Sequence, residues 1–288
     1  MMLQLPQVHY ITCDNSKEQY RMSYTAWGKQ ESSRKTLICV HGLNRNGRDW
    51  DYIGSHFAAL GYYVIAPDLV GRGNSDYLKD PLQYDIPYYV KDILLLIKTL
   101  NLTNIEWIGS SLGGLVGLAI VAMAEQLINK IVLVDIGVEI ERAGLTRIAS
   151  YSANQPDFDS YALAKDYLLS ISQGNGDLPQ DVWEQYARNS LQKNAKGRYE
   201  LKRDVNISKP FANAFPSDKN MELWPYWEKI NISSLIIRGA NSDILSAATV
   251  AKMQINHPKT QAVELPNTAH APFLYSAEHM TMLENFLL

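Results

Sequence analysis

The fold of this chain is decided by the stretch Ile105-Glu106-Trp107-Ile108-Gly109-Ser110-Ser111-Leu112-Gly113-Gly114-Leu115, which reads as an apolar strand, a glycine-rich turn and the start of a helix. A strand that reverses sharply into a helix leaves little room around its apex, so the positions two residues before and after the apex favour glycine. Ser111 has glycine at both positions. Ser110 has the bulky Ile108 and Leu112 there. Ser111 is therefore the candidate nucleophile, and we expect its side chain to point into a cleft.

The composition narrows the classes of protein to consider. The chain has 288 residues, of which 46% are hydrophobic, so it can bury a sizeable core. A formal net charge of −3 predicts no broad basic surface, and we expect no nucleic-acid partner. Cys13 and Cys39 are too few for a disulfide framework, and Cys39 lies in an apolar run where burial is expected. No cofactor and no metal are predicted.

The sequence also bears on the compartment. Its first residues lack the basic segment and the long apolar segment of a secretory signal. No stretch reaches the roughly 18 consecutive apolar residues of a membrane span. We therefore expect a cytoplasmic protein without a membrane span. The oligomeric state is not predicted.

Short apolar runs alternate with helical patterns along most of the chain. The runs predict strands at 8–13, 20–27, 36–40, 62–66, 105–108, 130–135, 232–238 and 260–265. Apolar residues at helical spacing predict helices at 88–100 and 277–287, and Asp49 is expected to cap another. This alternation predicts the α/β class, with a mostly parallel eight-stranded sheet flanked by helices.

The strand pattern stops between 137 and 227, where the sequence is compatible with helices and rich in tyrosine and tryptophan. We therefore predict an α/β core formed by 1–136 and 228–288, with 137–227 inserted as a helical cap. The cap is expected to form one wall of the pocket. Its aromatic residues are expected mainly to pack its own core, and Trp224 is a candidate substrate contact.

A serine nucleophile needs a base and a carboxylate that orients the base. In an open parallel sheet such groups lie on loops beyond the carboxyl ends of strands. His270 follows the last predicted strand and is the candidate base. Asp243 follows the strand 232–238 after a short loop with a glycine, and it is the preferred carboxylate. Asp135, at the end of the strand 130–135, is its main competitor.

Two further loops have expected roles. Backbone N–H groups of Leu43 and Leu112 are the candidate oxyanion donors, because Leu112 follows the nucleophile at a helix start and Leu43 lies in the loop after the strand 36–40. In the same loop, His41 is expected to hold the loop by hydrogen bonds. Asp68 is expected to bind backbone amides in its turn.

Two arginines follow the loop that contains Leu43. Arg45 and Arg48 are candidates for binding a substrate carboxylate or phosphate. Ion pairs within the loop are the alternative.

Five motifs in this order resemble the α/β-hydrolase superfamily, in its serine-nucleophile branch with a helical cap. They are the loop His41-Gly42-Leu43, the turn Asp68-x-x-Gly71-x-Gly73-x-Ser75, the elbow Gly109-Ser110-Ser111-Leu112-Gly113, Asp243 and His270. The resemblance implies a Ser111–His270–Asp243 triad beneath a cap. A serine at the apex argues against epoxide hydrolases and haloalkane dehalogenases, which use aspartate, and against dienelactone hydrolases, which use cysteine. The elbow also differs from the Gly-Gly-Ser-Trp-Gly of proline iminopeptidases.

These observations predict a hydrolase of carboxylic esters or lactones that works through an acyl-enzyme intermediate. Ser111 attacks, and water activated by His270 releases the acid. The expected partner is a small apolar ester or lactone. Two alternatives stay open: hydrolysis of a carbon–carbon bond in a vinylogous diketone, and a non-catalytic ligand-binding protein that keeps the fold.

Overall fold

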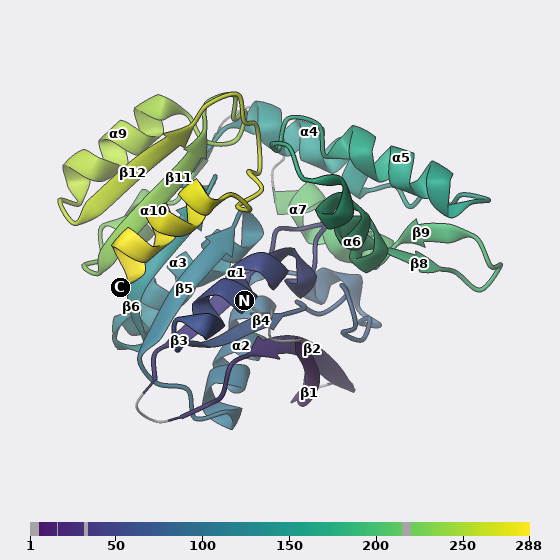
Figure 1. Ribbon diagram of the computed structural model, residues 1–288, viewed down its shortest axis with the longest axis horizontal. Coiled ribbons are helices and arrows are strands. Elements are labelled where there is room, and N and C mark those ends of the chain that lie inside the picture. The colour runs from purple at the N-terminus through teal and green to yellow at the C-terminus, as the bar shows by residue number, and fades with distance from the viewer. Residues whose placement is uncertain (1–5, 16, 32–33, 215–219) are drawn as a thin grey trace.

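An eight-stranded sheet runs through the centre of the computed structural model, which describes residues 6–15, 17–31, 34–214 and 220–288 (Figure 1). The spatial order is β1-β2-β4-β3-β5-β6-β11-β12. The strands are β1 (Gln7–Asp14), β2 (Gln19–Trp27), β3 (Thr36–Val40), β4 (Tyr63–Pro67), β5 (Ile105–Ser110), β6 (Ile128–Val134), β11 (Ser233–Gly239) and β12 (Thr260–Leu265). Two earlier expectations fall partly outside the described residues. The expected lack of a signal segment depends partly on residues 1–5, and the predicted cap includes 215–219.

The sheet is mostly parallel, as predicted. The pairs β1–β2 and β2–β4 are antiparallel. All other neighbouring strands of the sheet, from β4 to β12 in the spatial order, pair in parallel. Every residue of β3 and β4 is buried, which explains their continuous apolar sequences, since strands of a parallel sheet are covered on both faces. The predicted fold class is confirmed.

Helices cover both faces of the sheet. They are α1 (Asp51–Ala59), α2 (Ile86–Thr99), α3 (Leu112–Ala124), α9 (Ala247–Asn256) and α10 (Ala277–Leu287). Side chains of α1 and α10 share one buried apolar cluster with the sheet, and those of α2, α3 and α9 share another. The prediction that Asp49 caps the first helix is wrong. The short turn Gly47–Trp50 precedes α1, and Asn46 caps that turn by accepting a hydrogen bond from the N–H of Arg48.

The chain between β6 and β11 forms further helices and two short antiparallel strand pairs, β7 with β10 and β8 with β9. These elements are β7 (Glu139–Ile140), α4 (Arg142–Ser152), α5 (Tyr161–Ile171), α6 (Gln180–Ser190), β8 (Leu191–Lys193), β9 (Tyr199–Leu201), α7 (Lys209–Ala214), β10 (Met221–Glu222) and α8 (Trp224–Trp227). In Figure 1, α4, α5, α6 and the β8–β9 hairpin lie beyond one end of the sheet. The boundaries 137–227 stay a prediction.

A separate apolar cluster lies within this inserted segment. Its buried members come from α5, α6, β8 and β9, and Tyr161, Tyr167, Trp183 and Tyr199 pack against it. The aromatic residues of the segment thus largely pack against one another. None of the described helices combines the length and the apolar character needed to cross a membrane.

Candidate active site

Ser111 lies at the turn between β5 and α3 and has a backbone φ of 49°. Such an angle is uncommon for a residue other than glycine and is a feature of strained functional turns. A Cβ added at Gly113 would lie 2.1 Å from the carbonyl oxygen of Val40, and one added at Gly109 would lie 2.4 Å from the backbone of Gly113. Glycine is therefore required on both sides of Ser111 by close backbone contacts.

The loop after β12 brings His270 to Ser111. Nε2 of His270 lies 3.0 Å from Oγ of Ser111, and Nδ1 lies 2.8 Å from Oδ2 of Asp135. The side chains of His270 and Asp135 are almost fully buried, with exposed fractions of 6% and 0%. Because a carboxylate oxygen accepts, Nδ1 donates to Asp135 and Nε2 is free to accept a proton from Ser111.

The prediction that Asp243 supports His270 is wrong. Both carboxylate oxygens of Asp243 bind the guanidinium of Arg147 on α4, at 2.6 and 2.8 Å. This ion pair lowers the pKa of the Asp243 carboxyl. The structure places Asp135, which the sequence left as a competitor, at His270 instead.

The loop before Asp243 holds the carboxylate of Asp135. The backbone N–H of Gly239 donates to Oδ1 of Asp135 at 2.7 Å, and the hydroxyl of Ser242 donates to Oδ2 at 2.6 Å. With His270, three donors therefore surround a fully buried carboxylate. Hydrogen bonds of this number offset the cost of burying the charge.

The candidate oxyanion donors lie on either side of Ser111. Leu43 and Leu112 both line a cavity at the serine, and Leu112 is the first residue of α3. Neither N–H has a hydrogen-bond acceptor within the part of the chain that the structure describes. Arg72 fixes the loop of Leu43, because its buried guanidinium donates from Nε to the Leu43 carbonyl at 3.0 Å.

His41 and Asp68 hold the neighbouring loops, as expected. Nδ1 of His41 lies 2.7 Å from the carbonyl oxygen of Gly42, and Nε2 accepts from the N–H of Leu69 at 3.0 Å. Burial lowers the pKa of His41 to about 3, so the ring is neutral near pH 7. The Asp68 carboxylate accepts from two backbone N–H groups and one hydroxyl, on Gly47, Asn74 and Ser23.

Of the three candidate substrate contacts, only Arg45 lines a pocket at Ser111. Its Nε and Nη2 bind the carboxylate of Asp49 at 2.8 and 2.5 Å. Arg48 binds Asp51 instead and lines neither pocket at the serine. Trp224 packs against the main core and lines neither pocket. The pockets at Ser111 give no support to the expectation that Arg48 or Trp224 contacts the substrate.

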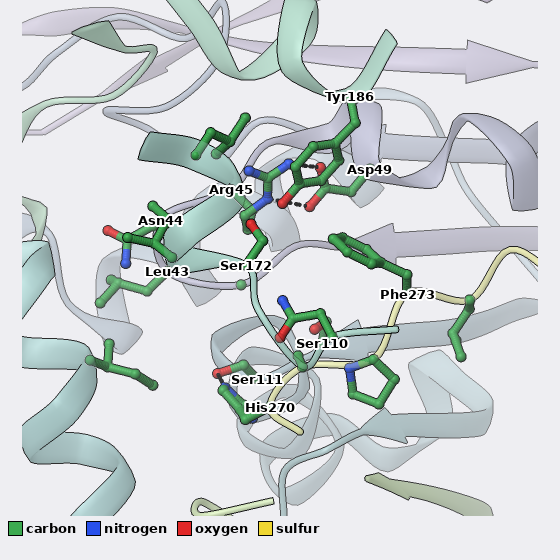
Figure 2. A pocket seen from close by; sticks show the side chains of 18 of the residues that line it. Leu43, Asn44, Arg45, Asp49, Ser110, Ser111, Ser172, Tyr186, His270 and Phe273 are labelled. Atoms are coloured by element: carbon green, nitrogen blue, oxygen red, sulfur yellow. Dashed lines mark hydrogen bonds and ion pairs between the residues drawn. The ribbon is translucent and has the colours of Figure 1, made fainter. Parts of the chain in front are cut away.

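Two pockets meet at Ser111, and Figure 2 shows one of them. In this view, Ser111 and His270 lie at one end of the pocket. Arg45, Asp49 and Tyr186 form the opposite end, where the guanidinium carbon of Arg45 lies 3.7 Å from the centroid of the Tyr186 ring. Among the described residues, no three His, Cys, Asp or Glu side chains gather in a way that could hold a metal ion.

Comparisons with known proteins identify the family of this chain. The sequence profile described as alpha/beta hydrolase fold matches residues 35–277. The 3-hydroxybutyrate-oligomer hydrolase of Cupriavidus necator is 31% identical over 98% of this chain and 97% of that protein. A putative hydrolase from Rickettsia typhi superimposes with a TM-score of 0.90 at 29% identity, covering 98% of both chains. An alpha/beta hydrolase from Novosphingobium aromaticivorans gives 0.86 at 31% identity, with the same coverage.

Proposed function

Because this chain is a hydrolase of the alpha/beta hydrolase family, we propose that it cleaves carboxylic esters with Ser111 as the nucleophile, His270 as the base and Asp135 as the orienting carboxylate. One observation carries the proposal. The imidazole of His270 lies 3.0 Å from the Ser111 hydroxyl on one side and 2.8 Å from the Asp135 carboxylate on the other. This is the arrangement that activates a serine for acyl transfer.

The reaction follows from these contacts. Oγ of Ser111 attacks the ester carbonyl carbon while Nε2 of His270 takes its proton. The N–H groups of Leu43 and Leu112 bind the negative oxygen that forms, and each such donor contributes about 10²–10³ to the rate. As the carbon–oxygen bond to the alcohol breaks, Nε2 returns its proton to the departing oxygen. An acyl group is then bonded to Ser111.

Water completes the cycle. Nε2 of His270 takes a proton from water as the water oxygen attacks the acyl carbon. The bond to Ser111 then breaks, the serine oxygen regains a proton from Nε2, and the carboxylic acid leaves. Asp135 keeps the imidazole in the required tautomer and stabilises its charged form in both halves of the cycle.

The substrate proposal is an ester built from hydroxy acids. The relative from Cupriavidus necator is named for hydrolysis of 3-hydroxybutyrate oligomers, in which ester bonds join the units. Short oligoesters of this kind are the proposed substrates, with lactones as a close variant. A hydroxy-acid ester has both apolar and polar parts, which matches the presence of one apolar and one more polar pocket at Ser111.

A substrate panel tests the proposal. It contains 3-hydroxybutyrate dimer and trimer, p-nitrophenyl esters of increasing acyl length, several lactones and a vinylogous diketone, each assayed with the wild type and with Ser111→Ala. We expect turnover of esters that Ser111→Ala abolishes, and labelling of Ser111 by a fluorophosphonate. Turnover of the diketone alone would point to carbon–carbon hydrolysis. Saturable ligand binding without turnover or labelling would point to a binding protein.

A further inference from the structure

The two pockets at Ser111 differ in chemistry. The pocket of Figure 2, here called the polar pocket, contains the ion pair of Arg45 and Asp49 and hydroxyl-bearing side chains such as Tyr151 and Tyr186. The second, here called the apolar pocket, is lined by aliphatic and aromatic side chains and by serines. Its lining includes Leu112, Leu115, Ile136, Leu145, Phe211 and Met221. Ser111 and Leu43 line both pockets.

The position of His270 distinguishes the two halves of a bound ester. His270 lines the polar pocket and not the apolar pocket, whereas Leu112 lines the apolar pocket and not the polar pocket. His270 must reach the departing alcohol oxygen in order to return its proton. Leu112 must stay beside the carbonyl oxygen, which belongs to the acyl half. The alcohol half therefore lies toward the polar pocket and the acyl chain toward the apolar pocket.

Arg45 is placed to recognise the alcohol half. Its Nε and Nη2 are engaged by Asp49, and Nη2 also by Ser190, whereas Nη1 makes no hydrogen bond to any residue that the structure describes. The side chain is 19% exposed and lines the polar pocket. The Asp49 pair and the Tyr186 ring hold the guanidinium in one orientation, which lowers the entropy lost when a ligand binds to it.

The stem of Arg45 begins beside the nucleophile, and its guanidinium lies at the opposite end of the polar pocket. A Cβ added at Gly42 would lie 3.6 Å from Cβ of Ser111 and 3.9 Å from Cγ of Arg45, so the two side chains begin on either side of Gly42. A short substrate that is bonded to Ser111 at its carbonyl carbon can therefore extend along the Arg45 side chain. The N–H groups of an arginine in this pocket can bind a substrate carboxylate. Because Asp49 already neutralises the guanidinium, this binding depends more on a directed hydrogen bond than on net charge.

We infer that the ester binds with its acyl chain in the apolar pocket and its alcohol half in the polar pocket, and that the alcohol half is a hydroxy acid whose carboxylate contacts Arg45. This inference rests on the proposed function. It predicts that a carboxylate on the alcohol half raises kcat/KM and that a carboxylate on the acyl half lowers it. In the apolar pocket an unpaired carboxylate would lose its hydration without gaining a partner cation.

Four small esters test the orientation without any change to the protein. The carboxylate is on the alcohol half in 3-(butanoyloxy)butanoate and is blocked in its methyl ester. It is on the acyl half in ethyl hydrogen succinate and absent in ethyl butanoate. We expect kcat/KM for the first compound to exceed that for its methyl ester about tenfold, since a hydrogen bond to a charged group is lost in the methyl ester. Ethyl hydrogen succinate should be cleaved more slowly than ethyl butanoate.

Arg45→Gln tests the residue, and Arg48→Gln is its matched control. Arg48 is a neighbouring arginine that is also paired with an aspartate but lines neither pocket. Arg45→Gln should lose the tenfold preference, and Arg48→Gln should keep it.

The outcomes separate the inference from the proposed function. If no ester is cleaved in a Ser111-dependent way, both fall. If esters are cleaved but the wild type shows no preference or the opposite preference, only the inference falls. The same holds if a folded Arg45→Gln protein keeps the preference of the wild type. If thermal unfolding shows that Arg45→Gln does not fold, the comparison of the four esters with the wild type still decides the orientation.

Discussion

Oδ2 of Asp135 lies 2.8 Å from Nδ1 of His270, and the same carboxylate accepts hydrogen bonds from Gly239 and Ser242. Asp135 directly follows β6, whereas Gly239 is the last residue of β11 and Ser242 lies in the loop after it. The two strands pair in parallel, with Val134 opposite Ile237, so their ends meet beside the histidine. The carboxylate therefore has one orientation, and the imidazole ring is fixed with it.

The first prediction concerns this carboxylate. Asp135→Asn should lower kcat for p-nitrophenyl butanoate by about 10⁴, the size of effect expected when a triad histidine loses its required tautomer. Asp243→Asn should keep kcat within about tenfold of the wild type, because it breaks only a partly exposed ion pair with Arg147. A larger loss in Asp243→Asn than in Asp135→Asn would contradict the assignment. Thermal unfolding of both variants provides the folding control.

The second prediction concerns the elbow. Gly113→Ala should lower the free energy of unfolding by about 3 kcal/mol or more, because its Cβ would lie 2.1 Å from the Val40 carbonyl oxygen and α3 would have to move. Gly61→Ala is the control. Gly61 has a φ of 95° but no atom within 4 Å of an added Cβ, so only backbone strain of about 1–2 kcal/mol is expected. Urea unfolding measures both, and equal effects would argue against the steric explanation.

The third prediction concerns His41. Burial lowers its pKa in the folded protein to about 3 from its ordinary value of 6.5. Below pH 6.5 the unfolded chain therefore binds a proton that the folded chain does not, and stability is lost as the pH falls toward 3. The fall in unfolding free energy between pH 7 and pH 4.5 should be smaller in His41→Gln than in the wild type. An NMR titration in which the His41 ring gains its proton near pH 6.5 would contradict this.

The fourth prediction has the opposite sign. Burial raises the pKa of Asp92 from 3.8 to about 6. The Tyr20 hydroxyl donates to one oxygen at 2.7 Å, and the other oxygen has no partner among the described residues. The folded chain keeps a proton that the unfolded chain loses, so stability falls as the pH rises from about 4 to 6. Asp92→Asn should be more stable than the wild type at pH 7.5, by up to roughly 3 kcal/mol, with a smaller difference at pH 4.

The fold could be predicted from sequence because its signals are local. Continuous apolar runs such as β3 and β4 are buried throughout, and the glycines of the elbow are required by contacts between neighbouring turns. The roles of His41 and Asp68 were likewise predictable, because both side chains hold the loops in which they lie or that lie next to them.

The carboxylate of the triad could not be decided in this way. Asp135 and Asp243 both follow strands, and the choice depends on how the loop of Gly239 and Ser242 folds back over β6. That contact joins residues about a hundred positions apart.

The ion pairs of the two arginines could have been predicted from their spacing in the sequence. Arg45 and Arg48 stand four and three residues before an aspartate, and the structure pairs each with that aspartate.

Ser111, Asp135 and His270 all lie outside 137–227, whereas Leu145, Phe211 and Met221 of the apolar pocket lie within it. Substitutions in that segment can thus reshape the apolar pocket while every hydrogen bond between the three side chains is kept. In evolutionary terms, the inserted segment can diverge quickly and the reacting groups slowly. Two homologues with the same serine, aspartate and histidine can therefore cleave different esters.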